Sequence, residues 1–502
     1  MKDRRSFLKT GAGIAGAAAL APAASLAQAP LGGQDADLRE RLDRQSRDPR
    51  GRILIKNATI ITMDRQVGDF ARGDLLIEGG KIADVKPAIT ASAQVFDAAG
   101  MIVIPGFADT HRHCASNTWN LAGLSPLPYV SPPSPRQRLA DLPKGPEWTP
   151  GRGPGNMQVE PEDVYAATMV SALTCAKSGV TCVADLSGNA RTPDHADAAV
   201  QAWIDSGMRV VYGSGGANSV SAERPYEDLV RLQKKYFTPA NPLLTLCLNT
   251  NIRQPDEQTV ARFEFARQHG LRVMIDGADW PEQGDTIVRL RRIWGPDITI
   301  IHCNDIGEAA WKVLAETRTE VSVAPFSEAL IGIANGVPPI QSALDVGIRP
   351  SLSSDVFQFS DFFTIMRMAA CIQRQRAFER WYEGDSTPPV PVTMRDVVDF
   401  ATVQGARGNG LLQRCGTLTP GKDADLLLIR ATDPNTVTPG NALATVVQAA
   451  DDSNLDTVMV AGKLRKFRGQ IVGMDVAKAI RAFQASRERL FARAGFKMDV
   501  LL

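Results

Sequence analysis

Short apolar runs alternate with turn residues between positions 53 and 104, and the same texture returns near the C-terminal end. Asn57, Gly79, Gly80 and Gly100 separate the early runs, as is typical of strands joined by tight turns. The runs lie at residues 53–55, 59–61, 74–77 and 101–104, and later at 424–429, 457–460 and 469–472. The pattern predicts two β-rich segments on either side of a differently organised middle.

In that middle, strand-like runs alternate with amphipathic helical stretches. The predicted strands are residues 103–108, 180–185, 209–212, 243–248, 272–275, 298–301, 321–323 and 350–353, and clear helices are predicted at 196–205 and 258–269. Alternation of this kind builds a parallel sheet, so the expected fold class is α/β. A strand count close to eight favours a closed (β/α)8 TIM barrel over an open sheet.

The first 29 residues differ from the rest of the chain. Arg4 and Arg5 precede an apolar, alanine-rich stretch from about residue 12 to residue 26, and small residues follow. This order is typical of an export signal, and the paired arginines resemble a bacterial twin-arginine signal. We therefore expect export through the Tat machinery and a periplasmic location. The alternative is an uncleaved membrane anchor, although the apolar run is shorter than the ~20 residues that a span needs.

Three further segments differ in composition from the predicted strands and helices of the barrel and the β-rich regions. Charged, turn-prone residues 30–51 are expected to be a linker, and residues 474–502 to contain an amphipathic helix from 476 to 494. Residues 117–161 are rich in proline and follow the first predicted barrel strand, where barrels build their active sites. We interpret this segment either as a lid or pocket wall or as an inert surface loop.

Composition excludes several classes of protein. The 502 residues are 44% hydrophobic and 22% charged, which is an ordinary globular balance. Lys and Arg total 56 against 55 Asp and Glu, a net charge of +1 that gives no electrostatic case for nucleic acid. The seven cysteines are scattered without a C-x-x-C pair, which argues against a disulfide framework or a thiolate metal cluster.

His111 and His113 carry the strongest chemical signal. They lie two residues apart at the end of an apolar strand, so both side chains point to one face while Arg112 points away. Two imidazoles at the mouth of a barrel are what a divalent metal ion requires from a first strand. The pair therefore predicts a metal site.

Five segments in order along the chain carry a family resemblance. They are residues 106–113 (GFADTHRH), 178–185 (SGVTCVAD), 301–304 (IHCN), 353–355 (SSD) and 416–426 (GTLTPGKDADL). They resemble the amidohydrolase superfamily, in its branch of cytosine, adenosine and S-adenosylhomocysteine deaminase-like and chlorohydrolase-like enzymes. The resemblance implies a TIM-barrel hydrolase domain at residues 105–415. It also implies a small composite β-sandwich built from residues 52–104 and 416–473.

The resemblance also implies roles for four residues. His111 and His113 would bind the metal ion, and Asp355 would bind it and take a proton from the nucleophilic water. His302 would polarise the water or the substrate, or would be a ligand in two-metal relatives. These roles fit together, because a metal cation lowers the pKa of a bound water molecule and an adjacent carboxylate can accept the proton that the water loses. The alternatives are a packed barrel histidine for His302 and a helix cap for Asp355.

The fifth predicted strand departs from the family, because it lacks the usual histidine. Asp276 and Asp279 keep the three-residue spacing of the family's His and Glu. Asp276 could supply an oxygen ligand and Asp279 could shuttle protons to a leaving amine. Alternatively, Ile275 occupies the ligand position and the site lacks one metal ligand.

Glu328 lies where deaminase-like relatives place a substrate-contacting Asn. A carboxylate there would favour an amine-bearing or cationic substrate group, and the alternative is a surface Glu at the start of a helix. His195 and His269 are expected to be structural, at the start and end of helices.

No Lys occurs between Tyr236 and Trp311, so the lysine bridge of two-metal relatives is missing. We therefore expect one divalent ion, zinc first, with iron or manganese as alternatives. The expected activity is hydrolysis of a non-peptide C–N bond in a small cyclic or aryl substrate, with deamination first. The rivals are a dehalogenating enzyme and a binding protein that has lost catalysis. Partners beyond the small-molecule substrate and the export machinery are left open, including a homo-oligomer.

Overall fold

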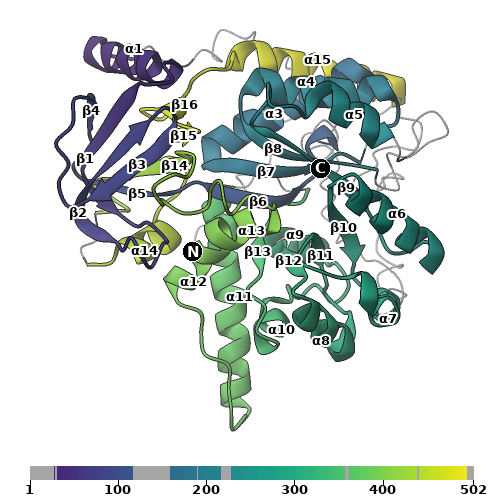
Figure 1. The fold of residues 1–502 in the computed structure, drawn as a ribbon. Coiled ribbons are helices and arrows are strands. Elements are labelled where there is room, and N and C mark those ends of the chain that lie inside the picture. The colour runs from purple at the N-terminus through teal and green to yellow at the C-terminus, as the bar shows by residue number, and fades with distance from the viewer. Residues whose placement is uncertain are drawn as a thin grey trace, which may run out of the picture.

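The computed structural model confirms the predicted α/β fold. Eight parallel strands curl in sequential order into a nearly closed barrel, and a separate nine-stranded sheet lies beside it (Figure 1). The structure describes residue 28 and residues 31–116, 159–188, 190–215, 226, 228–356, 361–437 and 440–494. The predicted signal at residues 1–29, apart from residue 28, and most of the proline-rich segment 117–161 lie outside these residues.

The barrel strands lie close to their predicted positions, with one correction. They are β6 (Phe107–Arg112), β7 (Val180–Leu186), β8 (Arg209–Ser214), β9 (Leu244–Thr250), β10 (Arg272–Ala278), β11 (Ile298–His302), β12 (Glu320–Val323) and β13 (Ser351–Leu352). The first barrel strand begins at Phe107 and not at residue 103, because Met101–Pro105 is strand β5 of the other sheet. Gly106 separates β5 from β6. A Cβ atom there would lie 2.0 Å from Thr181 Oγ1, so only glycine fits without displacing its neighbours.

Helices cover the outside of the barrel (Figure 1). Those that follow barrel strands are α3 (Pro161–Ser178), α4 (Pro193–Ser206), α5 (Asp228–Tyr236), α6 (Asp256–Gln268), α7 (Pro281–Arg289), α8 (Gly307–Thr317), α9 (Pro325–Ile331), α10 (Ile340–Asp345) and α11 (Phe362–Tyr382); α12 (Met394–Asp399) and α13 (Gly405–Gly408) come next. In β7, Val180 and Val183 pack into the outer core, whereas Cys182 and Ala184 belong to the inner one. This alternation decides which strand residues can reach a site inside the barrel mouth.

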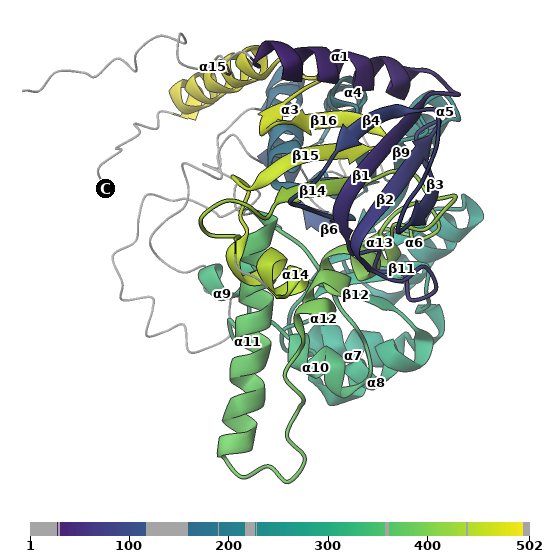
Figure 2. The same cartoon turned by 90° about the vertical axis from the view of Figure 1, so that its left-hand side faces the viewer.

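The separate sheet takes strands from both sides of the barrel sequence, as the resemblance implied. Its strands are β1 (Arg52–Ile60), β2 (Phe70–Glu78), β3 (Lys81–Lys86), β4 (Gln94–Asp97), β5, β14 (Leu426–Arg430), β15 (Leu455–Val460), β16 (Lys463–Phe467) and β17 (Gln470–Ile471), with the short helix α14 (Ala442–Ala444) between β14 and β15. The antiparallel pair β5–β14 joins the two halves, so strands from both ends of the chain lie in one sheet (Figure 2).

Buried charges join this sheet to the barrel. Arg209, at the start of β8, is fully buried and donates to Asp425 at 2.8 Å and to Asp423 at 2.9 Å. Asp423 also accepts from Lys81 at 2.9 Å and from Arg414 at 2.8 Å. Burial alone would raise the pKa of Asp423, but these three cations hold that pKa below its usual value. The Asp423 carboxylate is therefore charged and stabilising near neutral pH.

The segment predicted as a linker, residues 30–51, contains helix α1 (Gly33–Arg47). Its Leu42 is fully buried against the sheet, and Asp35 pairs with Arg468 at 3.0 Å. The segment is rich in Arg and also contains Leu and Gln, which are good helix formers, and its leucines provide an apolar face that the charge pattern obscures. At the other end, α15 (Val476–Ala494) spans the predicted residues.

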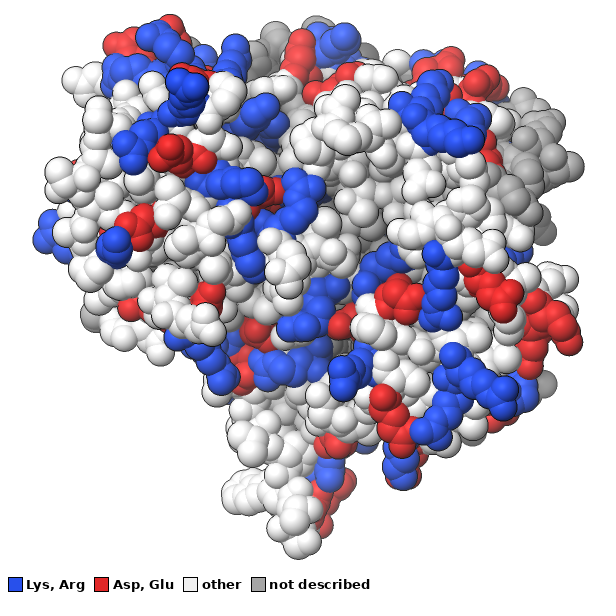
Figure 3. All heavy atoms as spheres, in the orientation of Figure 1, with Lys and Arg blue, Asp and Glu red and all other residues white. Residues whose placement is uncertain are grey.

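The outer surface of the described residues carries mixed charge. Basic and acidic side chains are interspersed on the face seen in Figure 3. Among the described helices, none combines the length and the apolar character required to span a membrane.

Candidate metal centre

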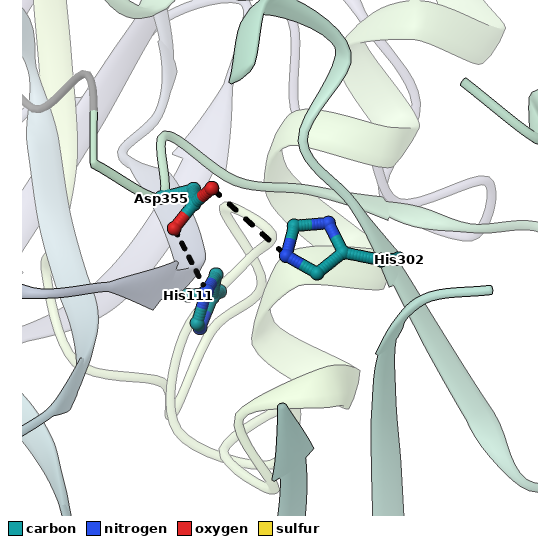
Figure 4. A group of neighbouring side chains, drawn as sticks. All are labelled: His111, His302 and Asp355. Carbon is teal, nitrogen blue, oxygen red and sulfur yellow. Dashed lines mark hydrogen bonds and ion pairs between the residues drawn. The ribbon is translucent and has the colours of Figure 1, made fainter. Parts of the chain in front are cut away.

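Three imidazoles and two carboxylates converge at the carboxyl end of the barrel. His111 lies in β6, His113 directly after it, Asp276 in β10, His302 at the end of β11 and Asp355 shortly after β13. The Nε2 atoms of His111 and His113 lie 3.1 Å and 3.3 Å from Asp355 Oδ1, and His302 Nε2 lies 3.9 Å from Asp355 Oδ2. Figure 4 shows His111, His302 and Asp355 facing one another.

The end of β6 directs both of its histidines into the barrel mouth. Arg112, between them, points the other way: its Nη1 donates to Thr174 of α3 at 3.1 Å and its Nε donates to Asp109 at 3.0 Å. Asp109 also accepts from the Ser354 hydroxyl at 2.6 Å. This buried carboxylate therefore ties the strand that carries the histidines to the segment that carries Asp355. No pattern in the sequence pointed to Asp109 for this role.

Hydrogen bonds fix how two of the rings present their nitrogen atoms. His113 Nδ1 lies 3.1 Å from the Leu186 carbonyl oxygen, and His302 Nδ1 lies 2.9 Å from Glu328 Oε1. A carbonyl can only accept, and an ionised carboxylate can only accept, so both Nδ1 atoms carry hydrogen. The Nε2 atoms are thereby left to face the centre, which is the usual arrangement of metal-binding histidines.

Asp355 is held in place by its backbone as well as its side chain. Its amide donates to the His111 carbonyl at 2.8 Å, and its φ of 52° is unusual for a residue other than glycine. His302 likewise has a φ of 76°, so strained backbone marks two strand ends at the site. Ser327 donates a short hydrogen bond to Asp355 Oδ2. The alternative of a helix cap is wrong, because Asp361 caps α11.

The structure also separates the two interpretations of the fifth strand. Ile275 packs in the outer core, so it cannot reach the centre. Asp276 points inward, with Oδ1 3.7 Å from His111 Nε2 and Oδ2 3.5 Å from His113 Nε2. It also lies 3.8 Å from His302 Nε2. Asp276, and not Ile275, is therefore the residue that reaches the centre from the fifth strand.

Burial and neighbouring charges shift the pKa values of the centre. Burial alone would lower the pKa of His113 and of His302, but hydrogen bonds and nearby carboxylates raise these values to about 9 and about 10. Burial alone would raise the pKa of Asp355 and of Asp276, but the imidazoles lower both, that of Asp355 to well below its usual value. The protonated imidazoles thus balance the negative charge of the carboxylates, and a bound cation can take over that role.

Two overlapping groups of three side chains could each hold a divalent cation: His111 with His302 and Asp355, and His111 with His113 and Asp276. Zinc bonds of about 2.1 Å in a tetrahedral arrangement place the ligand atoms about 3.4 Å apart. The separations between the three Nε2 atoms and the carboxylate oxygens run from 3.1 to 3.9 Å. Mixed imidazole and carboxylate donors suit zinc, iron or manganese.

Asp279 and Glu328 lie beside this centre. Asp279 is 8% exposed, accepts from Arg253 at 3.2 Å, and has its pKa raised to about 6, chiefly by burial. Glu328, in α9, is fully buried rather than on the surface, and its Oε1 accepts from His302 and from the Ala324 amide, both at 2.9 Å. The direct contact that the structure shows for Glu328 is therefore with a histidine of the site.

The remaining two histidines have local partners. His195 lies at the start of α4, with its Nε2 2.7 Å from the Val159 carbonyl oxygen, and His269 follows the end of α6.

Phe362, which follows Asp355 along the chain, is 1% exposed. It stacks on Phe107 with ring centroids 5.4 Å apart, so it belongs to the core.

Comparison with known proteins agrees with this geometry. Residues 292–465 match the model of the amidohydrolase family. The matched segment comprises 174 of the 502 residues. It includes β11, α9 and β13 and therefore carries His302, Glu328 and Asp355.

Relatives and solved structures extend the similarity beyond that segment. The chain is 26% identical over 466 residues to a 5'-deoxyadenosine deaminase of Methanosarcina acetivorans, covering 88% of this chain and 99% of the relative. It is 27% identical over 449 residues to a 5-methylthioadenosine/S-adenosylhomocysteine deaminase of Moorella thermoacetica, covering 85% and 96%.

Two solved structures share the fold. An adenosine deaminase from Xanthomonas campestris with bound zinc aligns with a TM-score of 0.71 and 18% identity, covering 88% of this chain and 98% of that one. Zinc-bound atrazine chlorohydrolase from Arthrobacter aurescens TC1 aligns with a TM-score of 0.71 and 19% identity, covering 87% and 100%.

Proposed function

We propose that this protein is a metal-dependent hydrolase that cleaves a non-peptide C–N bond of a small cyclic or aryl substrate by deamination. The observation that carries the proposal is that the imidazoles of His111, His113 and His302 all lie within 3.9 Å of the Asp355 carboxylate at the barrel mouth. The deaminase names of relatives that align over most of the chain support the same reaction class.

His111, His113, Asp276 and Asp355 are the proposed ligands of one divalent ion, with His302 beside it. Zinc is the first choice, supported by the zinc bound in both structural neighbours. When bound, such an ion would lower the pKa of a water molecule toward neutrality. Glu328 and the Leu186 carbonyl hold His302 and His113 in the orientation that this requires.

The acidic side chains move the protons. Asp355 accepts a proton from the attacking water, and its low pKa keeps it ionised for that purpose. Asp279, with a pKa of about 6, passes a proton to the departing nitrogen. Overall, the water oxygen forms a bond to carbon and the C–N bond breaks. One water proton leaves with the amine as ammonia, and the other ends on the adjacent ring nitrogen.

Ammonia release tests this proposal directly. Zinc-loaded protein should release ammonia from at least one member of a panel of amino-substituted nitrogen heterocycles and their nucleosides, and Asp355→Asn should not. Protein that carries one equivalent of metal but releases no ammonia from any of them would contradict deamination. Release of chloride from chlorinated members alone would indicate the dehalogenating alternative.

We further propose that the chain reaches the periplasm through a twin-arginine signal. Support comes from Arg4 and Arg5 ahead of the apolar stretch at residues 12–26. Fractionation of cells that express the full chain should recover the shortened protein in the periplasm, and Arg4→Lys with Arg5→Lys should retain it inside. Equal export of this variant would contradict a twin-arginine route.

A further inference from the structure

The Asp279 carboxylate has one hydrogen-bonding partner among the described residues, and that partner is Arg253. Arg253 Nη2 donates to Asp279 Oδ2 at 3.2 Å. The other carboxylate oxygen, Oδ1, is buried and has no partner within the described part of the chain. A carboxylate that passes a proton to a substrate must keep one oxygen within hydrogen-bond reach of it. Oδ1 is the oxygen left for this purpose, while Arg253 holds Oδ2.

Arg253 reaches Asp279 from the neighbouring strand. It lies in the turn between β9 and α6, and β9 pairs with β10, which Asp279 directly follows. The Asn251 side chain accepts from the Arg253 amide at 3.0 Å, a hydrogen bond that fixes the turn. The guanidinium passes close to Gly277, where a Cβ atom would lie 2.7 Å from Nη2 and where the φ of 82° also favours glycine. The ends of both strands are thus shaped to admit this one contact.

The contact between Arg253 and Asp279 does more for orientation than for stability. The Arg253 side chain is 53% exposed and the Asp279 side chain 11% exposed. An ion pair with an exposed arginine contributes little to folding stability, because water competes for the guanidinium. The buried carboxylate, in contrast, loses its protein partner when the arginine is removed, and it then turns toward whatever donor or water it can reach. Arg253 therefore fixes the direction of Asp279.

We propose that Arg253 is a positioning residue that holds Asp279 in the orientation from which it passes a proton to the departing nitrogen. The inference rests on the proposed deamination, in which Asp279 is the group that protonates the leaving amine. Arg253 binds Oδ2, so the proton that leaves with the amine is carried by Oδ1. Arg253 itself keeps its protons and its charge throughout the reaction.

Ammonia release by Arg253→Ala tests this role. The value of kcat should fall about 10- to 100-fold, a share of the about 10²- to 10⁴-fold that a positioned proton donor contributes, while KM and zinc content stay within about twofold. Guanidinium chloride, at concentrations that leave the fold intact, should restore part of the lost kcat by occupying the vacated position. Arg289→Ala is the matched control, because Arg289 is 54% exposed and pairs with Asp256 at 3.0 Å, and its kcat should equal that of the wild type.

The Asp279→Asn background shows whether Arg253 acts through Asp279. In that background Arg253→Ala should lower kcat by no more than about twofold further, because the group that it positions is already lost. An equal loss in both backgrounds would overturn the proposal and would indicate that Arg253 contacts the substrate directly.

The activity of the wild type separates this inference from the proposed function. An active wild type with an equally active Arg253→Ala counts against the positioning role alone. Wild-type protein that releases no ammonia counts against deamination and, with it, against the positioning role. The thermal unfolding of Arg253→Ala should match that of the wild type, which excludes a folding defect.

Discussion

Removal of the Glu328 carboxylate should weaken metal binding although Glu328 itself lies behind the centre. In Glu328→Ala, His302 Nδ1 and the Ala324 amide both lose the acceptor that each now has at 2.9 Å. The His302 ring is then free to rotate or to change its tautomer, so its Nε2 no longer faces the ion reliably. Loss of such a supporting partner typically costs about 10- to 100-fold in metal affinity.

Glu328→Gln separates the loss of the hydrogen bond from the loss of the side chain. Glutamine keeps an oxygen for His302 and the Ala324 amide, and its NH2 group takes the position of Oε2, which has no hydrogen-bond partner among the described residues. Zinc affinity should therefore stay within about tenfold of the wild type, closer than for alanine.

Competition with a chromophoric zinc chelator at fixed pH measures these affinities. Glu308→Ala is the matched control, because Glu308 is 79% exposed and pairs only locally with Lys312. Zinc binding by Glu328→Ala that is as tight as wild-type binding would refute the supporting role.

Three further predictions concern catalysis and stability. Asp355→Asn should lower kcat about 10²- to 10⁴-fold in the ammonia assay, because a general base is lost; an unchanged kcat would exclude Asp355 as proton acceptor. Asp423→Asn should reduce the free energy of unfolding by about 1.5–3 kcal/mol at pH 7. The pKa of Asp423 is lowered in the folded state, so this difference in unfolding free energy should shrink as the pH falls below about 4. Urea titrations at several pH values measure it, and a difference that stays constant with pH would contradict the reasoning. Gly106→Ala should destabilise the protein by several degrees in thermal unfolding, because its Cβ would lie 2.0 Å from Thr181 Oγ1; an unchanged midpoint would contradict the close packing.

The alternation of strand-like runs with helical stretches was sufficient to predict the barrel, because strands such as β7, β8 and β11 are buried along their whole length and read as continuous apolar runs. The two-residue spacing of His111 and His113 predicted their common direction, because side chains along a strand alternate between its two faces. Helix α1 was missed since its leucines are few among many charges, and their burial depends on a sheet whose strands lie far away in the sequence.

The partners that hold the centre together were less accessible from sequence. Asp109 bonds to Ser354 across 245 positions, and Glu328 reaches His302 across 26. Neither pair has a characteristic spacing, so only the closed barrel brings them together. The role of Asp276 depended in the same way on knowing that Ile275 faces outward.

Anomalous diffraction at the zinc edge, from crystals of the zinc-loaded protein, tests the central claim most directly. The account predicts one peak, within about 2.0–2.2 Å of Nε2 of His111 and His113 and of a carboxylate oxygen of Asp355. A peak bound elsewhere, or zinc-soaked crystals with no peak among these side chains, would contradict it.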